Sequence, residues 1–505
     1  MKTNYTKNSP GENNIFTGAY DINPYNIFTG LCKINLYFYK SADMEICSKE
    51  WEGKIIMSWR KMTALILTAM LALSLAACGG TGNNSQASGS TAEVNLDGDF
   101  TVSELRVAIW DNNQRDGLQQ IADAWTETSG VKVNVEVIDW GNYWTLLEAG
   151  ANGGDLPDVF WMHSNTSQMY MENDLLLNLD PYIAADDKID LSNYYPGIVE
   201  LFTRSDGVHY AVPKDHDTNA LLYNKAIFDA YGVTYPEDTW TYEDMYEAAK
   251  QIYEASNGDV YGIAMNTSNN QDGWYNLVYS YGAQVITDDH KGTTIGSEEG
   301  KAAMEMVRKL LTAGAPQSVV AETGTDSLFM SGKVGMIMQG SYMINAYYTA
   351  ENHDDYLWAM LPYADVNGNG TCEKEERYTA YNGLGWAAAF NTKDPNAAYS
   401  LISAFCCKEG QLKQSELGVT MGGMPGVSEA FANAFPGMDV TPFIRIEEEG
   451  SLFFRPYTRN TTIWEDKLNQ AGGFLDAWMD PSNPELMRTA CDNAQKIIDD
   501  AIAAE

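Results

Sequence analysis

The hydrophobic and polar positions after residue 104 follow the periods of strands and helices in turn. Residues 105–110 alternate like a strand, residues 118–125 repeat apolar side chains at helical spacing, and residues 131–137 form a second run rich in β-branched side chains. A strand–helix–strand order predicts an α/β domain with a parallel sheet. Because ligands gather at the carboxyl ends of such strands, we expect Trp110 and Trp140 near a binding rim.

A polar segment separates two apolar runs near the middle of the chain. Residues 208–212 alternate like a strand and stop at Pro213, which has no N–H to donate to a ladder. Residues 214–219 are polar, and residues 220–223 form the second apolar run. This pattern predicts a strand that leaves one folded unit, a polar crossing, and a strand that enters another unit.

Several shorter motifs follow the same logic of strand ends, helix starts and glycine turns. Thr241 is predicted to cap a helix that runs to about Ser256, with Asp244 completing an imperfect capping box. The motifs are LPDVFWMH at 156–163, TWTYED at 239–244, FMSGKVGM at 329–336, QGSY at 339–342, NGLGWAAAF at 382–390 and MGGMP at 421–425.

In this order, the motifs resemble those of the extracellular solute-binding proteins of ABC importers, in the carbohydrate-type family 1 that includes maltose-binding protein. The resemblance covers roughly residue 105 to the C-terminus, and the crossing matches at Tyr210, Pro213, Asp217, Tyr223 and Asn224. It implies a two-lobed, type II periplasmic-binding-protein-like α/β fold. Each lobe would be a mostly parallel sheet flanked by helices, with the ligand cleft between the lobes.

The resemblance also implies where the lobes begin and end. Lobe 1 would comprise residues 99–213 plus about 377–424, and lobe 2 would comprise residues 214–376 plus about 425–505.

By the same resemblance, the cleft binds a sugar through aromatic rings and hydrogen-bonding side chains. Asp217 takes the place of the family's acidic ligand-binding residue, and Tyr342 stands where the family stacks an aromatic ring. Three alternatives stay open: Trp274 and Tyr275 form either a sugar platform or core, Trp386 faces either cleft or core, and His163 is either a ligand contact or structural. The full expected set is Trp110, Trp140, Trp161, His163, Asn165, Asp217, Trp274, Tyr275, Tyr342, Trp386 and Arg455.

These expectations describe a monomeric receptor that closes on a mono- or oligosaccharide and hands it to the permease subunits of an ABC importer. No reaction and no required cofactor are expected. A surface glycoside hydrolase or lyase is the alternative, because carboxylates and aromatic rings are plentiful, but no motif singles out the carboxylate pair that such an enzyme needs.

Composition narrows the choice of ligand and partner. The formal net charge is −37, which argues against nucleic acid and against docking on an anionic membrane through the protein surface. The same charge suits a polyamine, so the same fold with a non-sugar solute also stays open. The 13 Trp and 30 Tyr residues favour a sugar.

The N-terminal region carries a secretion signal. Residues 57–61 are basic at their end, residues 62–77 are free of charge, and Cys78 follows the small residues Ala76 and Ala77. This resembles a bacterial lipobox, so residues 57–77 are expected to be a lipoprotein signal peptide that anchors Cys78 to the outer face of the cytoplasmic membrane. Residues 78–98 would be a flexible tether.

Residues 1–56 lie before this signal and lack helical periodicity. We expect them to be either untranslated or a disordered extension, with translation starting at Met57.

Residues 365–376 read DVNGNGTCEKEE and fit the calcium-loop pattern D-x-[DN]-x-[DN]-G-x5-E. The alternative is a solvated hairpin. Only three expected ligands are charged, so a structural calcium site here would be weak. The expected ligands are Asp365, Asn367, Asn369, Thr371, Glu373 and Glu376.

Overall fold

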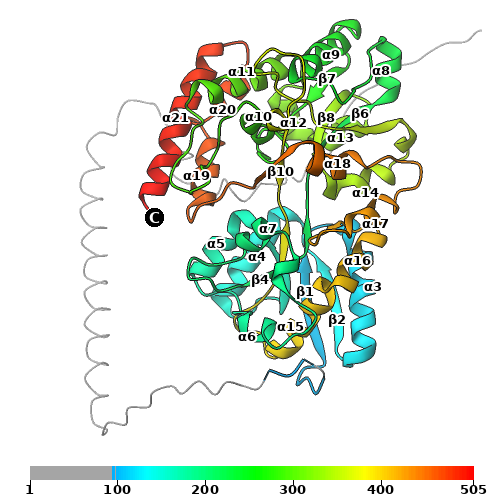
Figure 1. The fold of residues 1–505 in the computed structure, drawn as a ribbon, viewed down its shortest axis with the longest axis vertical. Helices are drawn as coiled ribbons and strands as arrows, with labels where there is room; N and C mark the ends of the chain where they lie inside the picture. Colours follow the sequence, from blue (N-terminus) through cyan, green and yellow to red (C-terminus); the bar gives the residue numbers. More distant parts are fainter. Residues whose placement is uncertain (1–93, 97) are drawn as a thin grey trace, which may run out of the picture. The chain divides into compact units, whose positions relative to one another are not determined.

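Two separate sheets frame the protein in the computed structural model, which describes residues 94–96 and 98–505 (Figure 1). The proposed signal peptide, Cys78 and nearly all of the tether lie outside the described residues. The described residues all belong to one compact unit. No helix within 94–96 and 98–505 combines the length and apolar character needed to cross a membrane.

The first sheet has five strands in the order β2-β1-β3-β11-β4. Strand β1 pairs in parallel with β2 and β3, whereas β11 pairs antiparallel with both β3 and β4. We call this sheet and the helices packed on it lobe 1. Its strands are β1 (Glu104–Ile109), β2 (Lys132–Val137), β3 (Val159–His163), β4 (Ala211–Pro213) and β11 (Leu384–Ala388).

The alternation of side chains along these strands builds two cores, one on each face of the sheet. Val107 and Ile109 belong to one core, and Ala108 belongs to the other. Two helices, α3 and α15, contribute to the first core, and α4, α5 and α7 contribute to the second. Their bounds are α3 (Asn112–Ser129), α15 (Pro395–Cys406), α4 (Trp140–Gly153), α5 (Ser164–Glu172) and α7 (Pro196–Leu201).

The second sheet has four strands in the order β7-β8-β6-β9, and with its helices it forms lobe 2. Strand β7 runs parallel to β8, and β6 runs antiparallel to β8 and β9. Figure 1 shows this sheet at the opposite end of the described unit from α3 and α15. The strands are β6 (Asn219–Asn224), β7 (Tyr261–Ala264), β8 (Val334–Gly340) and β9 (Tyr356–Ala359).

Both sheets are therefore mixed, and the expectation of mostly parallel sheets was wrong in that detail. The reason is that the chain re-enters each sheet after crossing between lobes. Strand β11 returns to lobe 1 and β6 enters lobe 2 from the crossing, so each meets its neighbours in the opposite direction.

Local sequence signals set the helix ends of lobe 2. Thr241 and Asp244 form a complete capping box at the start of α9 (Tyr242–Ala255), as predicted. Gly232 ends α8 (Lys225–Tyr231) with φ of 65°, a conformation that glycine adopts without strain.

The remaining helices complete the two lobes and the region of the crossings. They are α6 (Asp180–Ile183), α10 (Tyr275–Ser280), α11 (Glu298–Thr312), α12 (Gln317–Thr323), α13 (Thr325–Met330), α14 (Ile344–Tyr348), α16 (Lys408–Glu416), α17 (Ser428–Ala432), α18 (Pro442–Glu449), α19 (Thr461–Leu468), α20 (Leu475–Met479) and α21 (Pro484–Ala503). Short 3-10 turns are η3 (Leu191–Asn193), η4 (Ser341–Met343), η5 (His353–Asp355) and η6 (Lys374–Glu376).

Within the described residues, three segments connect the two lobes, and they run side by side. The first contains β5 (Asp215–His216), which pairs antiparallel with β12 (Met421–Gly422) of the third. The second joins β10 (Tyr378–Tyr381), which pairs with β13 (Ser451–Phe454), to β11. It bonds to the first through an antiparallel bridge between Asp217 and Asn382. We call these three segments the crossings.

Candidate ligand-binding site

A cleft of about 630 Å³ lies over the crossings and takes side chains from both lobes. Its size falls in the range of small-molecule sites. The lining residues are Trp110, Asp111, Gln114, Trp140, His163, Asn165, Asp215, Asp217, Asn266, Ser268, Asn269, Asn270, Gln271, Tyr342, Asn382, Gly383, Leu384, Thr420, Arg455, Glu465, Asp466 and Asn469.

The lobe 1 wall of the cleft is built from indole rings at the carboxyl ends of strands. Trp110 follows β1, and its ring lies 5.1 Å from that of Trp140 and 4.9 Å from that of Trp161, edge to face in both cases. Trp140 is 45% exposed, which is high for a tryptophan. The packed cluster therefore holds one large aromatic face at the cleft in a fixed position.

His163 ends β3 and extends the same wall. Its ring lies 5.4 Å from Trp140, and its Nδ1 lies 2.8 Å from Asn165 Oδ1. Burial, assisted by the nearby Arg455 charge, lowers the pKa of His163 to about 3, against the weaker effect of the Asn165 hydrogen bond. The imidazole is therefore neutral at physiological pH and can exchange hydrogen bonds with an uncharged ligand.

Asp217 lies in the first crossing at the floor of the cleft. Its Oδ1 accepts hydrogen bonds from the backbone N of Ser341 at 2.7 Å and from the Ser341 hydroxyl at 2.5 Å. Its Oδ2 accepts from Gln271 Nε2 at 2.8 Å. Burial, followed by the charge of Asp272, nevertheless raises the pKa of Asp217 well above its ordinary value. The carboxylate thus links the first crossing to two elements of lobe 2.

Five consecutive or nearly consecutive polar residues after β7 form a wall that the sequence analysis missed. We call this segment the amide loop: Asn266, Ser268, Asn269, Asn270 and Gln271. Gly273 lets the loop close on itself, because a Cβ there would lie 2.8 Å from the Asn266 carbonyl oxygen. Amide groups both donate and accept hydrogen bonds, which suits hydroxyl-bearing ligands. The sequence feature that could have revealed this wall is the run of amide side chains before Gly273.

Arg455 enters the cleft from the chain after β13 and is almost completely buried. Its Nη2 lies 2.9 Å from Glu465 Oε1, which also accepts from the Tyr275 hydroxyl at 3.0 Å. Arg455 Nε and Nη1 have no hydrogen-bond partner and no exposure. Arg455 is thus a buried charge at the cleft, paired with one carboxylate and keeping two enclosed nitrogens without a partner.

The structure brings seven of the eleven predicted residues to the cleft. Four others lie in the cores: placing Trp161 in the site was wrong, and for Trp274, Tyr275 and Trp386 the core alternative holds. Trp161 and Trp386 face each other across β3 and β11, and alternation turns both to the side of α15, where Trp386 stacks on Phe405 at 4.5 Å. Trp274 packs at 5.3 Å from Phe474, and Tyr275 is buried beside it. The seven are Trp110, Trp140, His163, Asn165, Asp217, Tyr342 and Arg455.

The predicted calcium loop is held by its own hydrogen bonds, and two of its amides are turned the wrong way for a cation. Asp365 accepts from the backbone N of Asn369 at 3.0 Å and of Gly370 at 3.1 Å. The side-chain nitrogen of Asn367 points at Glu376, and that of Asn369 points at Glu373. Both amides would have to rotate for their oxygens to face a cation. In 94–96 and 98–505, no group of three or more His, Cys, Asp or Glu is arranged to hold a metal, so calcium stays a prediction.

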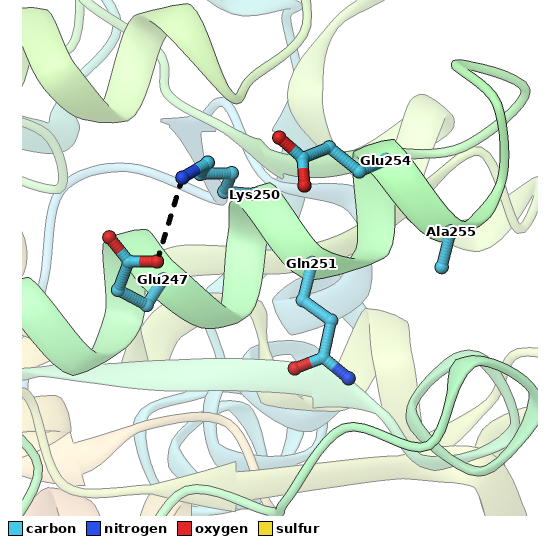
Figure 2. Close-up of a pocket in the computed structure, with 5 residues that line it drawn as sticks. All are labelled: Glu247, Lys250, Gln251, Glu254 and Ala255. Atoms are coloured by element: carbon cyan, nitrogen blue, oxygen red, sulfur yellow. Dashed lines mark ion pairs between the residues drawn. The ribbon is translucent and has the colours of Figure 1, made fainter.

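A second hollow lies on α9 and belongs to a different kind of surface (Figure 2). It measures about 290 Å³ and is lined by one helix only, with Lys250 3.9 Å from Glu247. Figure 2 shows the long side chains of Lys250, Gln251 and Glu254 spread along that helix without converging on a point. The hollow is therefore not a candidate site.

Two lobes joined by three crossings, with a cleft of rings and amides above them, define the two-lobed class of binding proteins. Residues 111–409, more than half of the chain, match the family model of the bacterial extracellular solute-binding proteins. The chain belongs to that family. The similarity predicted from the motifs is thereby confirmed.

Individual relatives are distant. A binding protein of Brucella abortus is 23% identical over 283 residues, which is 54% of this chain and 66% of the relative. The galactooligosaccharide-binding protein of Bacillus subtilis is 24% identical over 302 residues, 58% of this chain and 65% of the relative. The chain thus spans slightly less than two thirds of the length of these curated relatives.

The fold is shared with solved structures. An ABC substrate-binding protein of Listeria monocytogenes in complex with cycloalternan superposes with a TM-score of 0.67 at 21% identity, covering 78% of this chain and 98% of that one. The predicted two-lobed fold is confirmed by this likeness.

Proposed function

We propose that the protein is an extracytoplasmic receptor that binds a carbohydrate, and specifically an oligosaccharide, and delivers it to an ABC importer by hinge closure. The observation that carries this proposal is the composition of the cleft walls. One wall presents the 45% exposed ring of Trp140, and the opposite wall is the amide loop. A sugar ring has an apolar C–H face and a rim of hydroxyls, so it matches an aromatic face opposed by amides.

Charge in the cleft supports an uncharged ligand over a polyamine. Five carboxylates line it. Asp215 is paired with Lys214 at 2.6 Å and Glu465 with Arg455 at 2.9 Å. Asp111 accepts from Asn113 N and Gln114 Nε2, and burial raises the pKa of Asp466, which favours its neutral form. Asp217 is saturated by Ser341 and Gln271. A carboxylate whose oxygens are already engaged offers little to a cation, so the chain's overall negative charge does not by itself make this cleft a cation site.

Relatives support the same class of ligand. The Bacillus subtilis relative is named for galactooligosaccharides, and the Listeria monocytogenes structure contains cycloalternan. Receptors of this fold close about a hinge around their ligands. The crossings would serve as that hinge here, and the closed form would dock on permease subunits.

The test is calorimetry of the purified protein against cycloalternan, galactooligosaccharides, maltotetraose and spermidine. We expect heat of binding from at least one neutral sugar and none from spermidine. Binding of spermidine alone would overturn the choice of ligand class. Release of new reducing ends from a bound oligosaccharide during prolonged incubation would favour the hydrolase alternative instead.

We also propose that Cys78 carries a lipid that anchors the receptor to the outer face of the cytoplasmic membrane through the tether predicted at residues 78–98. The sequence LSLAAC at 73–78 supports this. The last residues of the tether are not free, because Asn95 donates to Asn396 and Leu96 accepts from Ser400, both on α15. Metabolic labelling with a palmitate analogue should mark the wild-type protein and not Cys78→Ser. A labelled Cys78→Ser protein would refute the anchor.

A further inference from the structure

Asp272 follows the amide loop directly and is buried at 5% exposure, yet it is not among the residues that line the cleft. Its Oδ2 accepts hydrogen bonds from the Tyr342 hydroxyl and from Asn269 Nδ2, the latter at 2.5 Å. Both donors line the cleft. Asp272 therefore lies directly behind two residues that line the cleft, Asn269 of the amide loop and Tyr342 of η4.

The two donors have few other fixed partners. Asn269 Nδ2 also lies 3.3 Å from the Tyr342 hydroxyl, so the three groups form a closed triangle. The Tyr342 ring packs on Gly340, where a Cβ would lie only 2.4 Å from the ring. The glycine lets the ring lie flat against the backbone, and Asp272 fixes the direction of its hydroxyl.

Asp272 Oδ1 is an unpartnered, fully enclosed oxygen. An ionised carboxylate with one oxygen unsatisfied is costly in a buried position. The negative charge of Asp272 offsets part of this cost, because it strengthens both hydrogen bonds to the cleft residues.

We propose that Asp272 is a positioning residue of the cleft: its ionised carboxylate sets the Tyr342 hydroxyl and the Asn269 amide for the ligand, so that ligand affinity follows the charge on Asp272. This inference rests on the proposed function, because it concerns the same cleft. Asp272 itself does not line the cleft, so it acts on the ligand through Tyr342 and Asn269, which do.

The surroundings of Asp272 place its pKa in the physiological pH range. Burial, followed by the Asp326 charge, raises its pKa to about 7, while the Tyr342 and Asn269 hydrogen bonds and the Arg455 charge act to lower it. Protonation would replace charge-assisted hydrogen bonds with neutral ones about half as strong and would add an O–H without a partner. The charged and titratable groups around it are Asp326 on α13, Tyr342 on η4, Tyr347 on α14, Arg455 after β13 and Asp217 in the first crossing.

Affinity and stability should then change in opposite directions with pH. Affinity requires the carboxylate, so it falls as the pH drops from 8 to 6, by up to about tenfold if only the ionised form binds. Stability behaves in the other way, because the pKa of Asp272 is higher in the folded protein than its ordinary value of 3.8. Its contribution is therefore fully present below 3.8 and is lost as the pH rises through about 7.

The experiment measures the dissociation constant of a binding member of the sugar panel at pH 6, 7 and 8 for the wild type, Asp272→Asn and Tyr342→Phe. We expect weaker binding by both variants at pH 8 and a flatter pH profile. The matched control is Asp394→Asn, an equally buried aspartate that caps α15 in lobe 1; it should lower stability and keep the wild-type pH profile.

A ligand-free measurement separates this inference from the proposed function. Crystal structures of the wild type and Asp272→Asn at pH 8 should show the Tyr342 ring or the Asn269 side chain displaced in the variant. If no sugar binds the wild type, the proposed function fails and this comparison alone decides the inference. Unmoved Tyr342 and Asn269 side chains, or an unchanged affinity and pH profile in Asp272→Asn, would overturn it.

Discussion

Asp215 Oδ1 accepts a hydrogen bond from the backbone N of Leu384 at 2.7 Å, which ties the first crossing to the second. The other oxygen of the same carboxylate accepts from Thr420 in the third crossing at 3.2 Å and from Lys214 at 2.6 Å. One side chain therefore joins all three crossings at the place where the lobes must pivot.

Replacing Asp215 by alanine should destabilise the protein strongly. Lys214 is completely buried and would lose its anionic partner, keeping only the Gln114 side chain and the Trp161 ring. Breaking a buried pair in this way costs about 3–5 kcal/mol. Urea unfolding monitored by tryptophan fluorescence measures the change in the free energy of unfolding.

The control for this variant is Asp206→Ala, which removes a carboxylate 2.8 Å from Arg204 at the surface. Exposed pairs are worth about 0–1 kcal/mol, so the control should stay close to wild type. Equal losses from Asp215→Ala and Asp206→Ala would contradict the role of Asp215.

Trp140→Ala should weaken sugar binding by about 1–2 kcal/mol, or roughly 5–30-fold, because it removes the exposed ring on the lobe 1 wall. The control is Phe390→Ala, a ring with the same 45% exposure that does not line the cleft. Calorimetry with the same sugar compares the two. An affinity loss shared by both variants would indicate a general effect of removing surface rings.

Contacts beside the cleft should favour the closed arrangement of the lobes. Arg459 of lobe 2 donates to Ser205 of lobe 1 at 3.1 Å and lies 3.6 Å from Glu172, and Tyr457 donates to Glu200 at 3.1 Å. Arg459→Ala should enlarge the radius of gyration of the free protein in solution scattering. Affinity should fall by at most about fivefold, since exposed pairs contribute about 0–1 kcal/mol.

Arg488→Ala provides the comparison, because Arg488 pairs at 3.3 Å with Glu298 inside lobe 2. It should change neither the radius of gyration nor the affinity. A free wild-type protein already as extended as Arg459→Ala would show that these contacts do not hold the lobes.

Calcium in the millimolar range should raise the melting temperature if residues 365–376 bind it, and a chelator should reverse the rise. Glu376→Gln should abolish the response, because the last position of such a loop supplies the bidentate carboxylate. Asp439→Asn, outside the loop, serves as the control. If calcium leaves the melting temperature of the wild type unchanged, the loop is a hydrogen-bonded turn and not a calcium site.

The sequence predicts the parts of this protein that depend on short-range patterns. Trp110 and His163 reach the cleft because they end buried strands, and Asp217 does so because it lies in a polar crossing. Strand direction after a crossing depends on long-range pairing, so the antiparallel entry of β11 was not visible.

Aromatic residues illustrate the limit most clearly. Trp161 and Trp140 look alike in the sequence, but Trp161 lies in a strand covered on both faces, whereas Trp140 begins a helix at the rim. The amide loop escaped notice because Asn and Ser in a turn usually indicate solvated backbone. Only the enclosing contacts, such as Gln271 with Asp217, reveal that these side chains serve the cleft.

The position of β11 has a consequence for the order in which the molecule is assembled. This strand lies inside the lobe 1 sheet, between β3 and the edge strand β4, yet it begins at Leu384, after the last strand of the lobe 2 sheet has ended at Ala359. A chain that emerges from the ribosome or the export channel N-terminus first can therefore pair all four lobe 2 strands while the lobe 1 sheet still lacks the strand that joins β4 to β3.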